Sequence, residues 1–520
     1  MDFETLKIFL SMSCYMVLVI GIGLYFAKRA NESSENYFIG GRSLGPWVTA
    51  MSAEASDMSG WLLMGLPGVA YWLGLSDAIW TAIGLFIGTY INWLLVAKRL
   101  HGYSIIANNS ITIPDFFSNR YKEKNKTIMM IAAVFILVFF TVYASSCFVT
   151  VGKLFSTLFG FSYQSMMIAG AIFVVVYTFL GGFLAESVSD FMQGLVMIFA
   201  LVIIFGTSIA YAGGPGKVIE NIKDIPGFLS FFGIANPEVA DGVQKVSENG
   251  VPLFGSAGNY GLLTILSTLS WGLGYFGVPQ VLLRFMAIRK NSELSKSRKI
   301  ATVWCFISLF AAVMIGLIGR SIYPTAHLTK SGAENIFITM TTNLLPSVFA
   351  GVVMAGILAA TISSSDSYLL IAASAFSKNI YQGIFKKDAT DKQVMKISRM
   401  ILVIIAVIGM IIAMDEKSII FTIVSFAWAG FGATFGPIML FSLFWKRTTR
   451  EGAIAGMLSG GIMVFIWKLL LKPLGGIFGI YELLPAFLIS CIVIIIVSIM
   501  SKEPSEDIQK EFDMAKKFVD

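Results

Sequence analysis

Long apolar stretches recur along the 520 residues of this chain, and they constrain its fold more than any other feature. A helix that spans a bilayer needs about 20 consecutive apolar residues. The composition agrees, since 56% of the residues are hydrophobic and 13% are charged, against about 25% charged in soluble domains. The sequence therefore predicts an all-helical polytopic membrane protein, with thirteen helices near 7–27, 47–70, 76–97, 128–157, 164–183, 189–212, 258–282, 300–321, 345–377, 397–414, 418–445, 452–471 and 480–500.

The lysines and arginines predict how these helices cross the membrane. Thirteen is an odd number, so the two ends of the chain fall on opposite sides. With the N-terminus outside, 28 of the 38 Lys and Arg residues belong to cytoplasmic segments, as the positive-inside rule requires. We therefore expect an N-out, C-in topology with residues 501–520 as a cytoplasmic tail. The net charge of +7 then reflects membrane orientation, and we expect no nucleic-acid partner.

The second predicted helix carries acids and serines where a membrane span is normally apolar, in the stretch Met51-Ser-Ala-Glu-Ala-Ser-Asp-Met-Ser-Gly-Trp-Leu-Leu-Met-Gly-Leu-Pro-Gly68. An ionised side chain at the bilayer centre costs at least roughly 2.5–3.5 kcal/mol, so Asp57 needs a partner or a function there. The nearby serines and glycines weaken the helix, and an opened turn directs carbonyls and hydroxyls toward a small cation. We interpret residues 55–60 as a helix break that contributes to an ion site.

The seventh helix contains a second break, in Ser270-Trp-Gly-Leu-Gly-Tyr-Phe-Gly-Val-Pro-Gln280. Three glycines within six residues and a following proline disfavour a continuous helix, while Trp271, Tyr275 and Phe276 offer aromatic walls. The two breaks lie five spans apart, as expected for inverted five-helix repeats that bind substrate and ion near the midplane. The alternative is that both are kinks that only let helices pack closely.

The ninth helix carries Ala359-Ala-Thr-Ile-Ser-Ser-Ser-Asp-Ser-Tyr368. Ala360, Ser363 and Ser364 share one helix face. With backbone carbonyls from the break near Ala55 and Met58, they supply about five oxygen ligands, a set that suits sodium because hard cations prefer oxygen. The alternative is that these serines bond to carbonyls four residues earlier in their own helix.

The sequence lacks the patterns that are typical of several other classes of protein. We find no zinc-ligand spacing, phosphate-binding loop or nucleophile elbow, so we expect no enzyme and no catalytic residue. The absence of repeated pore loops disfavours an ion channel, and the short tail disfavours a membrane sensor. Apart from the lipid bilayer and a small-molecule substrate, no partner protein is indicated.

Four stretches resemble signatures of the sodium/solute symporter family, and of its sodium/proline (PutP-type) branch in particular: Glu35–Gly45, Ser56–Gly68, Gly272–Gly277 and Ala427–Ala433. The similarity extends from about residue 5 to about 515, with the motifs in family order. It implies a LeuT-type fold in a single transporter domain, 1–500. The repeats would cover about 47–212 and 258–445, with peripheral helices at about 7–27, 452–471 and 480–500.

The resemblance also implies an activity, which is sodium-coupled symport of L-proline into the cell by alternating access, in a prokaryotic plasma membrane. Asp57 would organise a sodium site formed by the carbonyls of Ala55, Met58 and Ala360 and the hydroxyls of Ser363 and Ser364. The substrate pocket would contain Ser59, Trp61, Tyr143, Trp271, Tyr275 and Pro279. The alternative is a sodium- or proton-coupled symporter of another amino acid, a sugar acid or a carboxylate vitamin.

A further set of polar residues follows from the same resemblance. Asp190, at the start of the sixth span, resembles a position that some family members use for a second cation, and Asp366 and Ser367 lie one turn beyond the sodium serines. Our hypothesis is that these three form a second sodium or proton site. The alternative is that Asp366 is a hydrogen-bonded structural acid or lines a hydrated exit path.

Overall fold

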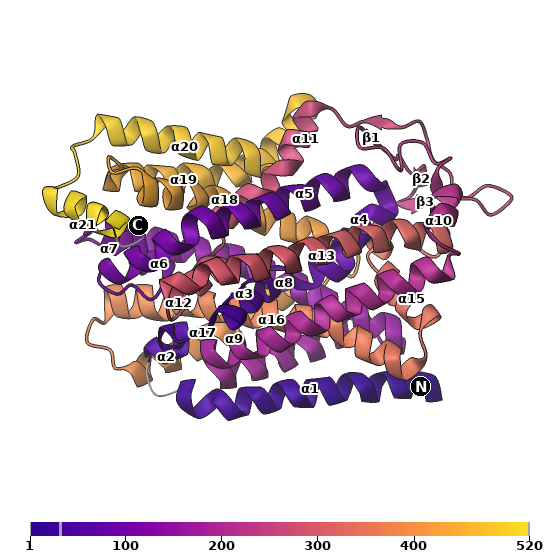
Figure 1. Cartoon of the computed structure of the whole chain (residues 1–520), viewed down its shortest axis with the longest axis horizontal. Helices are drawn as coiled ribbons and strands as arrows, with labels where there is room; N and C mark the ends of the chain where they lie inside the picture. The colour runs from indigo at the N-terminus through magenta and orange to yellow at the C-terminus, as the bar shows by residue number, and fades with distance from the viewer. Residues whose placement is uncertain (1, 31–33, 518–520) are drawn as a thin grey trace.

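The computed structural model describes residues 2–30 and 34–517, and Figure 1 shows helices running side by side along its long axis. The first half contains α1 (Phe3–Ala30), α2 (Ser34–Ile39), η1 (Gly40–Arg42), α3 (Pro46–Asp57), η2 (Trp61–Gly65), α4 (Leu66–Leu73), α5 (Leu75–Ile91), η3 (Asn92–Val96), α6 (Ala97–Ile106), α7 (Ile113–Arg120), α8 (Thr127–Phe159) and α9 (Tyr163–Tyr211). A connection follows with α10 (Pro215–Ile222), β1 (Gly233–Ile234), β2 (Val239–Ala240), β3 (Val243–Gln244) and β4 (Gly258–Asn259). The second half contains α11 (Leu262–Leu269), η4 (Ser270–Phe276), α12 (Pro279–Ala287), η5 (Asn291–Glu293), α13 (Leu294–Ile322), α14 (Lys330–Ala333), α15 (Ile336–Leu344), α16 (Ser347–Ser374), η6 (Ala375–Phe385), α17 (Asp391–Ile412), α18 (Ile420–Phe444), α19 (Arg450–Ile466), η7 (Trp467–Leu471), η8 (Lys472–Leu474), η9 (Gly476–Gly479), α20 (Leu483–Met500) and α21 (Glu506–Lys517).

The prediction of an all-helical polytopic membrane protein is confirmed, but fewer than thirteen helices qualify by length and composition. Within the described residues, ten helices are long and apolar enough to cross a membrane. An eleventh span arises if Leu262–Phe276 and Pro279–Ala287, which meet at a 40° bend, count as one. At the second and fifth predicted spans lie the shorter apolar helices Trp61–Leu73 and Tyr163–Phe179. The first of these is separated from α3 by a break, and the second continues into the sixth span through a turn at Gly182 (φ 60°).

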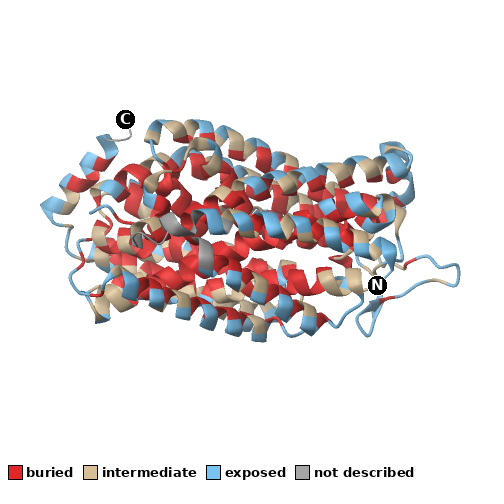
Figure 2. Cartoon of the chain, turned by 90° about the horizontal axis from the view of Figure 1, so that it is seen from below, coloured by how far each residue is buried: buried red, intermediate tan, exposed pale blue. Residues whose placement is uncertain are grey.

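The core of the bundle lies around α16, which packs against α9, α8 and α1. Every residue of α16 from Val353 to Ser374 is buried, and Figure 2 shows buried residues along the middle of the molecule with exposed ones at its periphery. Peripheral helices expose large apolar side chains, among them Ile411 and Ile499. An apolar exterior of this kind matches a lipid environment.

The two ends of the chain lie at opposite ends of the long axis (Figure 1), as expected from the thirteen predicted spans. The N-out, C-in orientation stays a prediction, and Lys28 and Arg29, which contribute to it, lie outside the side chains that the structure describes. The predicted tail contains α21, whose Glu511 and Asp513 pair with Lys122 and Lys446 at 2.9 and 2.7 Å. The tail is therefore a docked helix, not a free extension.

The connection between α9 and α11 adds structure that the apolar pattern does not show. β1 pairs with β4 and β2 pairs with β3, both antiparallel. The two sheets and α10 lie at the end of the bundle opposite the C-terminus (Figure 1).

Candidate functional site

The predicted break in the second span is present between α3 and η2. α3 ends at Asp57, and Ser59 has a φ of 20°, which interrupts the helix. A Cβ placed on Gly60 would lie 2.4 Å from the side chain of Thr150 on α8. Because such a contact is too close for any side chain, the break fits against α8 only with glycine at this position.

The carbonyl freed by this break faces the serines of α16. In a continuous helix the Ser59 amide would donate to the Ala55 carbonyl, but here it donates to Ser364 Oγ at 3.0 Å. The Ala55 carbonyl instead accepts from Ser363 Oγ at 2.8 Å and from Ser364 Oγ at 3.3 Å. Ser363 Oγ also lies 3.3 Å from the Ala360 carbonyl. The structure thus brings together four of the five predicted sodium ligands.

Met58, the fifth predicted ligand, lies in the break itself, and its carbonyl accepts from the Leu62 amide at 3.1 Å. A carbonyl oxygen has two lone pairs, so this bond leaves one for a cation. The alternative, a hydrogen bond to a carbonyl of the same helix, holds for Ser365, whose hydroxyl donates to the Thr361 carbonyl at 2.5 Å. The two predicted serine ligands differ from it, because both reach across to α3.

Asp57 connects the two broken spans. Its carboxylate accepts from Tyr275 Oη at 2.8 Å and from Gln280 Nε2 at 3.4 Å, and these partners lie in η4 and α12. The Asp57 carbonyl accepts from Tyr143 and Tyr368 at 3.4 and 3.5 Å. A buried acid with four polar neighbours on four other elements can hold the break in one geometry.

An aromatic cluster lies against the break. The rings of Trp61 and Trp271 are 5.5 Å apart, and Phe421 lies 5.7 and 5.4 Å from them. Trp428 donates its indole N–H to the Trp271 carbonyl at 2.8 Å, and Tyr481 stacks on Trp271 at 5.1 Å. Within the described residues the buried Trp61 indole nitrogen has no partner. The centre of the cluster is therefore apolar except for the Trp61 indole N–H, which has no acceptor among the described residues.

Five of the six predicted substrate residues lie around these contacts: Ser59, Trp61, Tyr143, Trp271 and Tyr275. Pro279 instead begins α12 and lines a separate small cavity with Thr112 and Ser374. Sequence reasoning missed Tyr368, Phe421 and Trp428. The first follows Ser364 by four residues, so helix periodicity alone was a signal for it.

The predicted second cation position contains a cation of the chain itself. Arg284 is fully buried, and its guanidinium donates to Glu186 and, at 3.1 Å, to Asp190. It also donates to Ser367 Oγ at 2.8 Å and to Ser52 Oγ at 3.0 Å. The topology prediction counts Arg284 among the 28 cytoplasmic cations, because it follows the seventh predicted span, 258–282. That assignment is wrong, since the residue lies on α12 inside the bundle.

Asp366 lies beside this group. Its Oδ1 accepts from the Ser367 amide at 2.8 Å. One oxygen of each of Glu186, Asp190 and Asp366 is buried without a partner in the part of the chain that the structure describes. Two carboxyl groups, those of Glu186 and Asp190, thus share one guanidinium, and Asp366 is joined to this group through Ser367. Glu186 and Arg284 are the members that sequence reasoning missed.

A second buried ion pair lies on the other side of the aromatic cluster. Lys153 on α8 contacts Glu334 at 2.7 Å, with side-chain exposures of 5% and 2%. Glu334 also accepts from the backbone amides of Ile420 and Phe421, at the start of α18, at 3.0 and 2.9 Å. A carboxylate at a helix N-terminus is favourable, and here it fixes Phe421 over Trp61.

Sequence comparison finds relatives of this chain among known proteins. Residues 37–460 match the sodium:solute symporter family. Sodium/proline symporters of several Staphylococcus aureus strains, USA300 and NCTC 8325 among them, are 38% identical over 517 residues, which is 98% of this chain and 96% of theirs.

Solved structures show the same fold. A sodium-coupled sialic acid symporter, captured substrate-bound and outward-open, superposes with a TM-score of 0.76 at 16% identity, covering 96% of this chain and 99% of its own. Mhp1, a nucleobase-cation-symport-1 family transporter in a closed conformation, gives 0.53 at 12% identity, covering 92% and 98%. The chain is a transporter, not an enzyme, with the LeuT-like fold, and it belongs to the sodium:solute symporter family, whose members couple solute transport to sodium.

Proposed function

We propose that this symporter carries L-proline into the cell with sodium. The observation that carries the proposal is that the break in the second span contacts both the α16 serines and the break in the seventh span. The Ala55 carbonyl accepts from the α16 serines, and the Asp57 carboxylate accepts from Tyr275, whose ring lies 5.0 Å from that of Trp428 in the aromatic cluster. The sodium/proline symporters at 38% identity support proline as the solute.

In the proposed ion site, sodium binds the carbonyls and hydroxyls of Ala55, Met58, Ala360, Ser363 and Ser364, with Asp57 as organiser. Both serine hydroxyls now point at the Ala55 carbonyl, so sodium entry turns their protons away and their lone pairs inward. The ion then links α3 to α16. Because Asp57 lies two residues from Ala55 and bonds Tyr275, sodium also orders the aromatic cluster, and the coupling is reciprocal.

Proline would occupy the region of Ser59, Trp61, Tyr143, Trp271 and Tyr275. Its carboxylate suits the donors at the helix break, and its ammonium and ring suit aromatic faces, with about 0.5–2 kcal/mol for each cation–π contact. A zwitterion moving with one Na⁺ carries one net charge, so uptake gains about 2.3 kcal/mol per 100 mV.

We extend the proposal to the second cation position and to topology. Asp190, Asp366 and Ser367 form a second sodium or proton site, at which the Arg284 guanidinium donates to Asp190 and Ser367 in this conformation. The inverted repeats correspond to about 47–212 and 258–445 within one domain, in a bacterial plasma membrane with the N-terminus outside.

The test is uptake of labelled L-proline by proteoliposomes under an inward Na⁺ gradient, with K⁺ and proton gradients as comparisons. We expect sodium-dependent accumulation that Asp57→Ala abolishes and Ser363→Ala weakens. Ser365→Ala is the matched control, because that hydroxyl bonds within its own helix.

Sodium-dependent stabilisation by a different solute, without proline uptake, would replace proline with another amino acid, a sugar acid or a carboxylate vitamin. Equal loss in Ser363→Ala and Ser365→Ala would refute the assigned ion site.

A further inference from the structure

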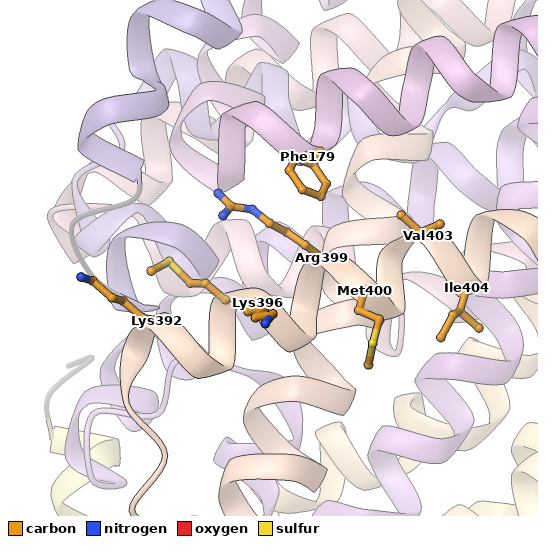
Figure 3. A pocket seen from close by; sticks show the side chains of 8 residues that line it. Phe179, Lys392, Lys396, Arg399, Met400, Val403 and Ile404 are labelled. Atoms are coloured by element: carbon orange, nitrogen blue, oxygen red, sulfur yellow. The ribbon is translucent and has the colours of Figure 1, made fainter.

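A groove on the surface of the bundle combines cationic and apolar walls. It lies between α17 and the end of the first half of α9, where Phe179 forms one wall (Figure 3). Lys392, Lys396 and Arg399 line one part of it, and Met395, Met400, Val403 and Ile404 provide apolar lining. None of these residues belongs to the ion site or to the aromatic cluster.

The lining residues of α17 share one helix face and change in polarity along it. Positions 392, 396, 399, 400, 403 and 404 follow the spacing of a single face, and Figure 3 shows the cations at one end and the apolar side chains toward the other. The twelve steps from Lys392 to Ile404, at about 1.5 Å each, give about 18 Å, close to the roughly 15 Å of one leaflet's hydrocarbon. The groove therefore matches a lipid molecule in both length and polarity.

The cations of this groove differ from others at the same end of the bundle. Lys122, Lys446 and Arg450 have carboxylate partners at 2.7–3.0 Å. Lys392 and Lys396 are exposed, and the ion pairs formed among the described residues include neither of them. The two lysines are thus available to an external anion.

Arg399 and the helix terminus add to this cationic end. The Arg399 guanidinium lies 5.0 Å from the Phe179 ring and 5.9 Å from the Tyr37 ring, so it is held between α9 and α2 beside the lysines. Lys392 is the second residue of α17, whose N-terminus carries partial positive charge and also holds the carboxylate of Asp391 in its first turn. By the positive-inside rule this end faces the cytoplasm, where the leaflet contains anionic lipids.

We propose that this groove binds an anionic diacyl phospholipid such as phosphatidylglycerol. Its phosphate lies among Lys392, Lys396 and Arg399, and an acyl chain follows Met400, Val403 and Ile404. The bound lipid joins the start of α17 to α9 just before the turn at Gly182, and it therefore stabilises the bundle at that point.

The test measures lipid retention and affinity by native mass spectrometry of the full chain, titrated with phosphatidylglycerol or phosphatidylcholine. Each lysine near the surface contributes about a fivefold factor in affinity for anionic lipid. Lys392→Gln with Lys396→Gln should therefore weaken phosphatidylglycerol binding roughly thirtyfold. Lys386→Gln with Lys387→Gln, which removes the same charge from the preceding connection, should leave it near the original value. Met400→Trp should also weaken binding, because it fills the apolar part without changing charge.

Two further arms separate a lipid site from an anion site. Inorganic phosphate and deacylated glycerophosphoglycerol should compete poorly, since neither occupies the apolar part. Equal affinity in the two lysine pairs would overturn the proposal, as would full competition by free phosphate or equal retention of phosphatidylcholine. Unchanged thermal midpoints of the lipid-free variants establish that each one is folded.

Discussion

Replacing Arg284 with methionine tests whether the buried acids form a cation site. Methionine keeps most of the side-chain length but removes the only cation bonded to Glu186 and Asp190 within the described residues. Removing one partner of a buried ion pair costs about 3–5 kcal/mol, because the other charge stays buried and unpaired. Loss of the donors to Ser52 and Ser367 adds to this cost. We expect Arg284→Met to lower the free energy of unfolding by at least about 3 kcal/mol in potassium.

Sodium should then return part of the lost stability. An ion present at a hundred times its dissociation constant stabilises the folded state by about 2.7 kcal/mol. Sodium bound among Asp190, Asp366 and Ser367 should therefore restore a large part of the lost unfolding free energy. The assay is unfolding in detergent, followed by tryptophan fluorescence, in Na⁺ and in K⁺ at constant ionic strength. The measured quantity is the extra stabilisation by sodium in the variant compared with the original chain.

Arg320→Met is the matched control. Arg320 is 1% exposed, lies over the rings of Tyr71 and Phe254, and donates to Gln244, so its loss leaves no bonded carboxylate behind. If sodium stabilises Arg284→Met no more than Arg320→Met, the acids around Arg284 do not form a cation site. If Arg284→Met loses no stability at all, the guanidinium does not compensate those acids.

Three further changes have defined outcomes. Tyr275→Phe removes the 2.8 Å hydrogen bond to Asp57, and since a hydrogen bond to a charged group contributes about 1.5–3 kcal/mol, the sodium concentration for half-maximal uptake should rise roughly tenfold or more. Lys153→Met leaves Glu334 buried without its cation and should cost about 3–5 kcal/mol of unfolding free energy, which Glu334→Gln in the same chain should partly restore. Burial lowers the pKa of His327, in the connection after α13, to about 4 from 6.5. The unfolded chain then binds more protons between these values, so stability should fall as pH drops from about 6.5 toward 4, and His327→Gln should flatten that part of the unfolding profile.

Each of these three has an outcome that contradicts it. An unchanged sodium requirement in Tyr275→Phe would separate Asp57 from the ion site. Equal unfolding of Lys153→Met with and without Glu334→Gln would show that the buried charge is not the cause. The same pH profile in His327→Gln would assign the acid sensitivity to other groups.

The helix breaks and the α3–α16 contact could be predicted from sequence, whereas Arg284 could not. Glycines and a proline act on the backbone where they stand, so the interruptions near Asp57 and Trp271 have a local cause. Hydropathy placed the end of the seventh span near residue 282 and left Arg284 in a loop. Its partners Glu186 and Ser367 lie about 80 to 100 residues away in the sequence, and an average taken along the chain contains no information about them.

Span counting was limited for a similar physical reason. A length criterion registers continuous apolar helices, and the second span consists of two short pieces because the positive φ of Ser59 interrupts it after α3. The aromatic partners show the same limit, since Phe421 joins the cluster through Glu334, which fixes the start of α18 from a different element.

If the Ala55 carbonyl is a sodium ligand, as proposed, its hydrogen bonds to two serines bear on how readily the transporter releases the ion. Without sodium, two hydroxyls already satisfy this oxygen, so an arriving ion displaces bonds that together contribute roughly 1–3 kcal/mol. That competition weakens sodium binding by roughly 5- to 150-fold relative to a set of unbonded oxygens. Once the site opens to the low-sodium interior, the serines return to Ala55 and the ion leaves without any further distortion of α3. In the proposed site, these serine hydrogen bonds would therefore keep the sodium affinity low, which favours rapid turnover over tight capture.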